Sequence, residues 1–100
     1  MTGDLINLSA RSVRHLLKDR QVSPLELLDA LEHRINEVDG AVNALPTLCF
    51  ERARKHARER DVSSLPLAGI PVVIKDLLPV SGVRTTFGSM AYRDHIPDAS

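Results

Sequence analysis

One lysine stands directly after a run of apolar residues, in the segment Pro66-Leu67-Ala68-Gly69-Ile70-Pro71-Val72-Val73-Ile74-Lys75-Asp76. The β-branched run Ile70–Ile74 predicts a strand that is buried on both faces. Active sites of open α/β sheets lie at the carboxyl ends of strands, which is where Lys75 would fall. Loss of hydration there would favour the neutral amine, and a neutral amine can act as a general base. The residue pattern by itself still favours a plainer interpretation, in which Lys75 and Asp76 end a strand and turn to solvent.

The other residue types that perform chemistry show no spacing typical of a site. Asp76 is expected to brace the turn after the lysine or to accept hydrogen bonds from nearby backbone amides. Cys49, beside Phe50, is expected to be a buried packing residue. No histidine has Cys49 or another histidine at a metal-ligand spacing, so we predict no metal site and no cofactor. The four histidines are His15, His33, His56 and His95.

Three helices are predicted before the lysine segment. The first spans residues 9–19, with Ser9 as its N-cap. The second begins at the capping box Ser23-Pro24-Leu25-Glu26, and Gly40 is a natural stop for it. The third spans residues 50–60, and its few apolar residues are small enough to permit close packing.

The pattern after residue 62 changes from helical to extended. Ser81-Gly82 predicts a tight turn between two extended pieces. We therefore expect an α/β fold in one domain, with a helical region over residues 1–62 and the start of a sheet core over residues 63–100. A strand buried on both faces needs neighbours on each side, and the chain ends before it supplies them. We accordingly expect an incomplete core and marginal stability for this chain alone.

The charge balance excludes strong electrostatic steering by the whole chain. Lysine and arginine number 13, aspartate and glutamate also number 13, and the formal net charge is zero. No stretch approaches the roughly 18 apolar residues of a membrane span, and the start lacks a secretory signal. A single cysteine fits a reducing compartment. We therefore expect a cytoplasmic protein with neither nucleic acid nor membrane as a partner, and a third helix whose mixed charges face solvent.

Several short motifs occur in a fixed order along the chain: Pro66–Pro71, Val72–Asp76, Gly82, Thr85-Thr86 and Gly88-Ser89. Together they resemble the segment around the catalytic lysine of the amidase signature family. Ser23–Glu26 and Asn43-Ala44 also stand where many members have a similar helix start and a following asparagine. The resemblance implies an amidase-signature α/β/α core, present here only as its N-terminal part.

The resemblance also implies a mechanism for amide bond hydrolysis. Lys75 would take a proton from a serine in a cis conformation, which relays one from a nucleophilic serine. An acyl-enzyme then forms, ammonia or an amine leaves, and water completes hydrolysis of a small-molecule amide. In full-length members both serines lie in a glycine- and serine-rich stretch downstream. Ser63-Ser64 precede the lysine and Ser89 belongs to the lysine segment, so we carry over Lys75 and no serine.

Two classes of function remain open. The first is an amide hydrolase, seen as an N-terminal fragment that lacks both serines and is inactive alone. This class includes the A subunit of glutamyl- and aspartyl-transfer-RNA amidotransferases, which resemble the same segment. The second is a non-catalytic truncated remnant or an interaction module, which would self-associate or pair with another chain through an open sheet edge.

Overall fold

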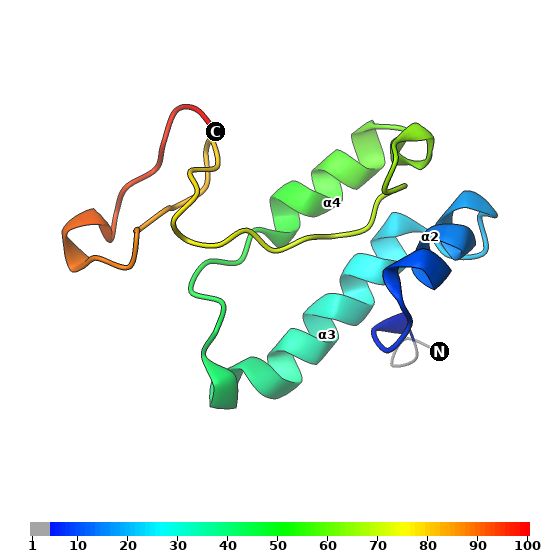
Figure 1. Cartoon of the computed structure of the whole chain (residues 1–100), viewed down its shortest axis with the longest axis horizontal. Helices are drawn as coiled ribbons and strands as arrows, with labels where there is room; N and C mark the ends of the chain where they lie inside the picture. Colours follow the sequence, from blue (N-terminus) through cyan, green and yellow to red (C-terminus); the bar gives the residue numbers. More distant parts are fainter. Residues whose placement is uncertain (1–4) are drawn as a thin grey trace.

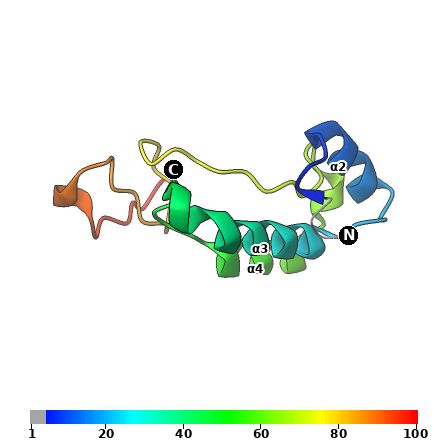
Figure 2. The ribbon, with the colours of Figure 1, turned by 90° about the horizontal axis from the view of Figure 1, so that it is seen from below.

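In the part of the chain that the structure describes, three α-helices are followed by a long segment without further α-helix or strand (Figure 1). The computed structural model describes residues 5–100. Its helices are α2 (Ala10–Lys18), α3 (Pro24–Val42) and α4 (Phe50–Glu59), with short 3₁₀ turns η1 (Val62–Ser64) and η2 (Met90–Tyr92). In Figure 2, α3 and α4 form one layer, and the chain beyond residue 65 passes over that layer toward a projecting C-terminal arm, residues 81–100.

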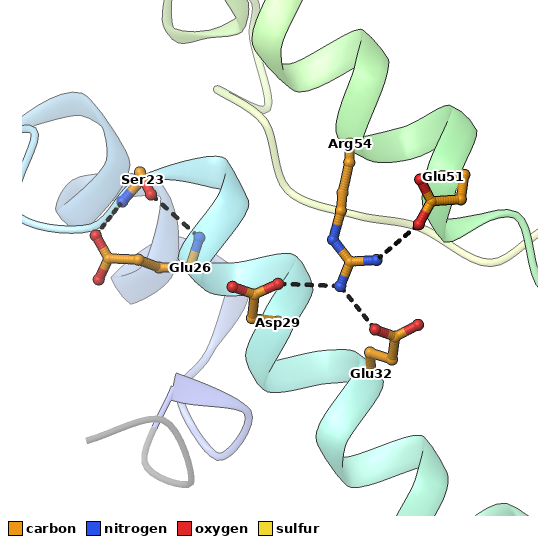
Figure 3. A network of polar contacts seen from close by, with 6 residues as sticks. All are labelled: Ser23, Glu26, Asp29, Glu32, Glu51 and Arg54. Carbon is orange, nitrogen blue, oxygen red and sulfur yellow. Dashed lines mark hydrogen bonds and ion pairs between the residues drawn. The ribbon is translucent and has the colours of Figure 1, made fainter.

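The helix starts are those that the sequence predicts. Ser9 caps α2 by accepting a 3.1 Å hydrogen bond from the Ser12 amide. At α3 the Glu26 amide donates to Ser23 Oγ over 3.1 Å, and the Ser23 amide donates to Glu26 Oε1 over 3.4 Å (Figure 3). Both bonds of the capping box are therefore formed, and they satisfy amides that a helix start leaves unpaired.

The end of α3 differs from the prediction. Gly40 does not stop the helix, which continues to Val42. Asn43 takes the left-handed conformation, with φ 53° and ψ 45°, and its amide donates to the Asp39 carbonyl. The Asp39 carboxylate accepts a 2.8 Å hydrogen bond from the Ala44 amide. Asparagine tolerates this backbone conformation. Asn43 and Asp39 therefore end the helix at Val42, beyond Gly40.

The core lies where α2 and the first half of α3 meet the chain near residue 68. Its buried members are aliphatic, and Ala68 is fully buried. Ile6, Leu16 and Ile70 pack against it while partly exposed. Its buried members are Leu5, Val13, Leu17, Val22, Leu27, Ala30 and Ala68.

The turn at residues 65–69, here the anchor turn, is tied to α2 by two basic side chains. Arg14 Nε donates to the Pro66 carbonyl over 2.7 Å. Lys18 Nζ donates to the Leu65 carbonyl over 3.4 Å. Hydrogen bonds with a charged donor are stronger than those between neutral groups. The anchor turn is therefore fixed on the helices although about fifty residues of chain separate it from α2.

Glycine is required at position 69 of the anchor turn. Its φ is +100°, which disfavours any residue with a side chain. A Cβ there would also lie 2.9 Å from Pro24 Cγ and 2.9 Å from Val62 Cγ2. Gly69 therefore lets the chain pass directly against the start of α3, with Ala68 buried beside it.

The predicted α/β fold is wrong for the described residues. Between residues 5 and 100 there is no strand or sheet, and the β-type pairing is limited to an isolated bridge between Val80 and Val83 around the predicted turn. Residues 63–100 accordingly hold no sheet core. The run Ile70–Ile74 is apolar, but no described residue supplies the neighbouring backbone that makes an extended segment into a strand.

Arg54 joins α4 to α3 and is not part of a solvated face. Its Nη2 contacts Asp29 Oδ1 at 3.0 Å and Glu32 Oε1 at 2.7 Å, and its Nη1 lies 3.8 Å from Glu51 Oε1 (Figure 3). The guanidinium also lies over the Phe50 ring. Hydrogen bonds to Glu32 and then to Asp29 raise the pKa of Arg54 above its ordinary value. Arg54 therefore holds α3 and α4 together in one layer.

Replacing Ser23 tests the capping box. Ser23→Ala leaves the Glu26 amide without its side-chain acceptor, and we expect the free energy of unfolding to fall by about 1 kcal/mol. Ser23→Thr retains a hydroxyl acceptor and should unfold close to the unmodified chain. Urea titrations followed by far-ultraviolet circular dichroism measure both. An unchanged midpoint for Ser23→Ala would show that the box does not stabilise α3.

Candidate active site

An open cleft of about 540 Å³ lies between α3 and α4 on one side and the chain around Lys75 on the other. One wall comes from α3 and from the start of α4, including Leu31, Ile35 and Phe50. The opposite wall is the segment Pro71–Asp76 together with Val80 and the residues that follow it. The lining is mostly apolar, with a few polar groups. Those polar groups are Thr47, Lys75, Asp76, Arg84 and Thr85.

Lys75 lies in the wall of this cleft, at the end of the apolar run as the sequence predicts. Its carbonyl accepts a 3.0 Å hydrogen bond from the Leu78 amide, so the chain turns immediately after it. The side chain is exposed, and among residues 5–100 its ammonium makes no hydrogen bond or ion pair. In this chain the side chain therefore turns to solvent, as the plainer interpretation of the residue pattern expects.

Asp76 forms a clasp with Thr86. The Thr86 amide donates to Asp76 Oδ1 over 2.7 Å, and the Thr86 hydroxyl donates to Asp76 Oδ2. The hydroxyl bond, then the amide bond, with a smaller contribution from the positive charge of Arg84, hold the pKa of Asp76 below its ordinary value. The predicted role of Asp76 as a brace for neighbouring backbone is confirmed. This Asp76–Thr86 clasp ties the turn after Lys75 to the Thr85-Thr86 motif.

Hydrogen bonds within the C-terminal arm fold its end back onto the residues around Thr85. The Thr85 amide donates to the His95 carbonyl over 3.0 Å, and the Gly82 amide donates to the Pro97 carbonyl over 3.0 Å. Phe87 and Tyr92 meet edge to face with centroids 5.2 Å apart, and His95 lies 5.6 Å from Tyr92. The arm is therefore a folded-back loop with its own aromatic cluster.

Two arginines that the sequence interpretation missed connect the arm to the helical half. Arg52 of α4 donates to the Ser81 carbonyl. Arg84 donates to the Arg93 carbonyl within the arm and to Thr47 Oγ1 over 3.3 Å. The mixed charges of α4 gave no sign of these contacts, because a carbonyl acceptor 29 residues away leaves no mark in local charge spacing.

The serines near the lysine are occupied in local turns. Ser64 Oγ donates to the Asp61 carbonyl over 2.9 Å. Ser89 Oγ accepts a 3.2 Å hydrogen bond from the Ala91 amide at the start of η2. Neither bond activates a hydroxyl for attack, because activation requires a neighbouring base.

Other candidate chemistry is limited within the part of the chain that the structure describes. Cys49 is exposed, so its predicted burial is wrong; it precedes α4 without a capping hydrogen bond. Residues 5–100 contain no group of three histidine, cysteine, aspartate or glutamate side chains arranged to hold a metal ion. Among the same residues, no helix is both long and apolar enough to cross a membrane.

Acid should open the Asp76–Thr86 clasp. Because the pKa of folded Asp76 lies below the unfolded value of about 3.9, its stabilisation is present above that pH and is lost as pH falls through the lower folded value. We expect the melting temperature of Asp76→Asn to be lower at pH 7 and to fall less between pH 5 and pH 2. Asp94→Asn, which removes an exposed carboxylate, is the control and should follow the unmodified chain. Identical pH profiles for Asp76→Asn and the unmodified chain would contradict the clasp.

Comparison with known proteins identifies the family to which this chain belongs. The family model described as Amidase matches residues 26–100. Similar proteins include the A subunit of glutamyl-tRNA(Gln) amidotransferase from Thermoanaerobacter pseudethanolicus, 36% identical over 94% of this chain and 20% of the relative. The corresponding protein of Neorickettsia sennetsu is 40% identical over 95% of this chain and 21% of its own length.

The match covers nearly all of this chain and little of each relative. A third relative of the same name, from Methylacidiphilum infernorum, is 45% identical over 78% of this chain and 16% of its own length. No solved structure matches. This chain thus spans about a fifth of the curated relatives it resembles. The matched region contains Lys75, Asp76 and Thr86, and the chain belongs to the Amidase family.

Proposed function

We propose that this chain carries the lysine base of an amide hydrolase that breaks carbon–nitrogen bonds by a Ser-cisSer-Lys mechanism. The observation that supports the proposal is the placement of Lys75 within the family match, in the wall of a cleft and directly before the Asp76–Thr86 clasp. The clasp restrains the turn at the lysine, and a restrained base is what proton transfer in a fixed geometry requires.

The substrate class in this proposal is a small amide. The relatives are named for glutamyl-tRNA(Gln) amidotransferase, which supports the amide of glutamine as one candidate and the role of that enzyme's A subunit as one form of the function. Lys75 receives a proton from the cis serine, the nucleophilic serine attacks the amide carbon, and ammonia or an amine leaves before water releases the acid. Both serines come from polypeptide outside the matched fifth.

The exposure of Lys75 bears on activity. Covering it by further polypeptide would remove water and favour the neutral amine. The 100 residues alone therefore lack both the nucleophile and the environment that makes lysine a base.

The isolated chain should be inactive. We expect no ammonia release from glutamine or from simple aliphatic amides above the rate in buffer, measured by a coupled ammonia assay. The Lys75→Ala variant should give the same background. Hydrolysis by the purified chain that disappears in Lys75→Ala would show that the chain is a complete catalyst, contrary to the proposal.

A chimera tests the lysine directly. The segment of the Thermoanaerobacter pseudethanolicus relative that matches this chain is replaced by residues 1–100, and ammonia release from glutamine is measured. We expect activity, with Lys75→Ala lowering kcat by about 100-fold or more. Lys75→Arg should be as impaired, because arginine stays protonated. Lys55→Ala, on the exposed face of α4, is the matched control. An active chimera that is indifferent to Lys75→Ala would refute the assignment.

The alternative is a non-catalytic remnant or interaction module. The observation in its favour is the apolar segment before Lys75, in which Val72, Val73 and Ile74 are 65%, 72% and 51% exposed. The chimera distinguishes the two functions, because a remnant has no reason to retain a working lysine segment.

A further inference from the structure

A buried threonine lies behind the wall of the cleft and contacts the residue that follows Lys75. Thr86 is 9% exposed, and within residues 5–100 it is not among the residues that line the cleft. Its amide and its hydroxyl both donate to the carboxylate of Asp76, which does line the cleft. In the described part of the chain, Thr86 therefore acts on the site through Asp76 and not by touching what the cleft holds.

A second hydrogen bond fixes the direction of the Thr86 hydroxyl. The Gly88 amide donates to Thr86 Oγ1 over 3.3 Å. A hydroxyl has one hydrogen to donate and lone pairs that accept. Since the Gly88 amide occupies an acceptor position, the hydroxyl hydrogen remains directed at Asp76. Two hydrogen bonds in series polarise each other, so the carboxylate is held more firmly than by the hydroxyl alone.

The turn that supplies the Gly88 amide has a strained backbone. Phe87 and Gly88 have φ values of 54° and 70°, and the Ser89 amide donates to the Thr86 carbonyl over 2.9 Å. Two successive positive φ values closed by this bond are typical of a type I′ turn. A positive φ is unfavourable for a bulky side chain, and strain of this kind gathers at functional sites. The Phe87 ring packs in the aromatic cluster of the arm, which stabilises the turn.

The arm that carries Thr86 is itself tied to the helical half. Arg52 of α4 donates to the Ser81 carbonyl. Arg84 donates to Thr47 Oγ1, in the connector between α3 and α4. Thr86 is therefore held with respect to the helices and does not simply follow the movements of the lysine turn. It transmits the position of the helical half to the Asp76 carboxylate.

We propose that Thr86 is a positioning residue for Lys75, on which it acts by holding the Asp76 carboxylate. This inference rests on the proposed function of Lys75 as a base. Asp76 follows Lys75 directly, and the Lys75 carbonyl accepts from the Leu78 amide, so the turn begins at the lysine itself. Holding the carboxylate holds the backbone from which the lysine side chain starts. A base on a fixed backbone stays within hydrogen-bond reach of the group whose proton it takes.

Kinetics of the chimera with the Thermoanaerobacter pseudethanolicus relative test this role, with glutamine as substrate. Thr86→Val removes the hydroxyl at nearly constant volume, and we expect kcat to fall about 10-fold while KM stays within about twofold. Thr86→Ser keeps the hydroxyl and should restore most of kcat. Ser81→Ala is the matched control, because its hydroxyl donates to the Asp98 carbonyl of the same arm. This control should leave kcat unchanged.

A double-mutant cycle tests whether Thr86 acts through Asp76. Asp76→Ala removes the same contact from the other side and should lower kcat at least as far as Thr86→Val. Adding Thr86→Val to Asp76→Ala should cost nothing more, because the contact is already absent. Additive losses would show that Thr86 acts elsewhere and would overturn the proposal.

Backbone order parameters from nitrogen-15 relaxation test the restraint on the 100-residue chain without any activity. We expect values near about 0.85 at Lys75 and Leu77 in the unmodified chain, and below about 0.6 in Thr86→Val and in Asp76→Ala. Ser81→Ala should keep the higher values. Order parameters that are unchanged in both clasp variants overturn the proposal, including where the chimera is inactive. Far-ultraviolet circular dichroism checks that each variant keeps its helices, and Asp76→Ala carries the comparison if Thr86→Val unfolds.

The kinetic outcomes separate this proposal from the proposed function. If Lys75→Ala has no effect on an active chimera, the lysine is not the base and the positioning role is refuted with it. If the chimera requires Lys75 while Thr86→Val keeps full kcat, the positioning role alone is refuted. A raised KM with unchanged kcat would assign Thr86 to substrate binding and overturn the proposal. Equal losses in Thr86→Ser and Thr86→Val would overturn it too, because the hydroxyl would then be irrelevant.

Discussion

The close approach of Gly69 to Pro24 is the constraint on which the lysine segment depends. The anchor turn is pressed against the start of α3 at a distance that excludes any side chain at position 69. Arg14 holds the same turn from α2. From this fixed point the chain passes over the layer formed by α3 and α4. The segment Pro71–Asp76 on this path lines the cleft opposite the helices.

Lys75 sits between two fixed points and next to a free stretch. The anchor turn holds the chain before the segment, and the Asp76–Thr86 clasp holds it after. Val72–Ile74 between them has no hydrogen bonds of its own among the described residues. The helical half is stabilised by caps and by the Arg54 ion pairs, all independent of this stretch. Lys75 therefore lies in a segment that is held on both sides by hydrogen bonds, and not in a helix or strand.

Local signals in the sequence predicted the parts that depend on local chemistry. Ser9 and the Ser23–Glu26 box gave the helix starts, and Asp76 gave its brace, because each acts on backbone a few residues away or on a nearby turn. The sheet was not predicted correctly, since hydrogen-bond partners for residues 70–74 are a property of other chain segments. The exposed side chain of Lys75 agrees with the plainer of the two interpretations of the residue pattern, in which the lysine turns to solvent. Arg14 and Arg52 donate to distant backbone carbonyls, and Arg84 donates to the Thr47 hydroxyl. No local pattern encodes these contacts.

The position of the single tyrosine gives the arm and the helices separate spectroscopic signals. The chain has one tyrosine and no tryptophan, and Tyr92 packs on Phe87 inside the C-terminal arm. The helices lie in the other half and dominate the peptide absorption band. Tyrosine emission and the tyrosine part of the near-ultraviolet ellipticity therefore originate from the arm, while far-ultraviolet ellipticity originates mainly from α2, α3 and α4. Loosening of the arm changes the first signals and leaves the second unchanged, so the two halves can be followed separately in one sample.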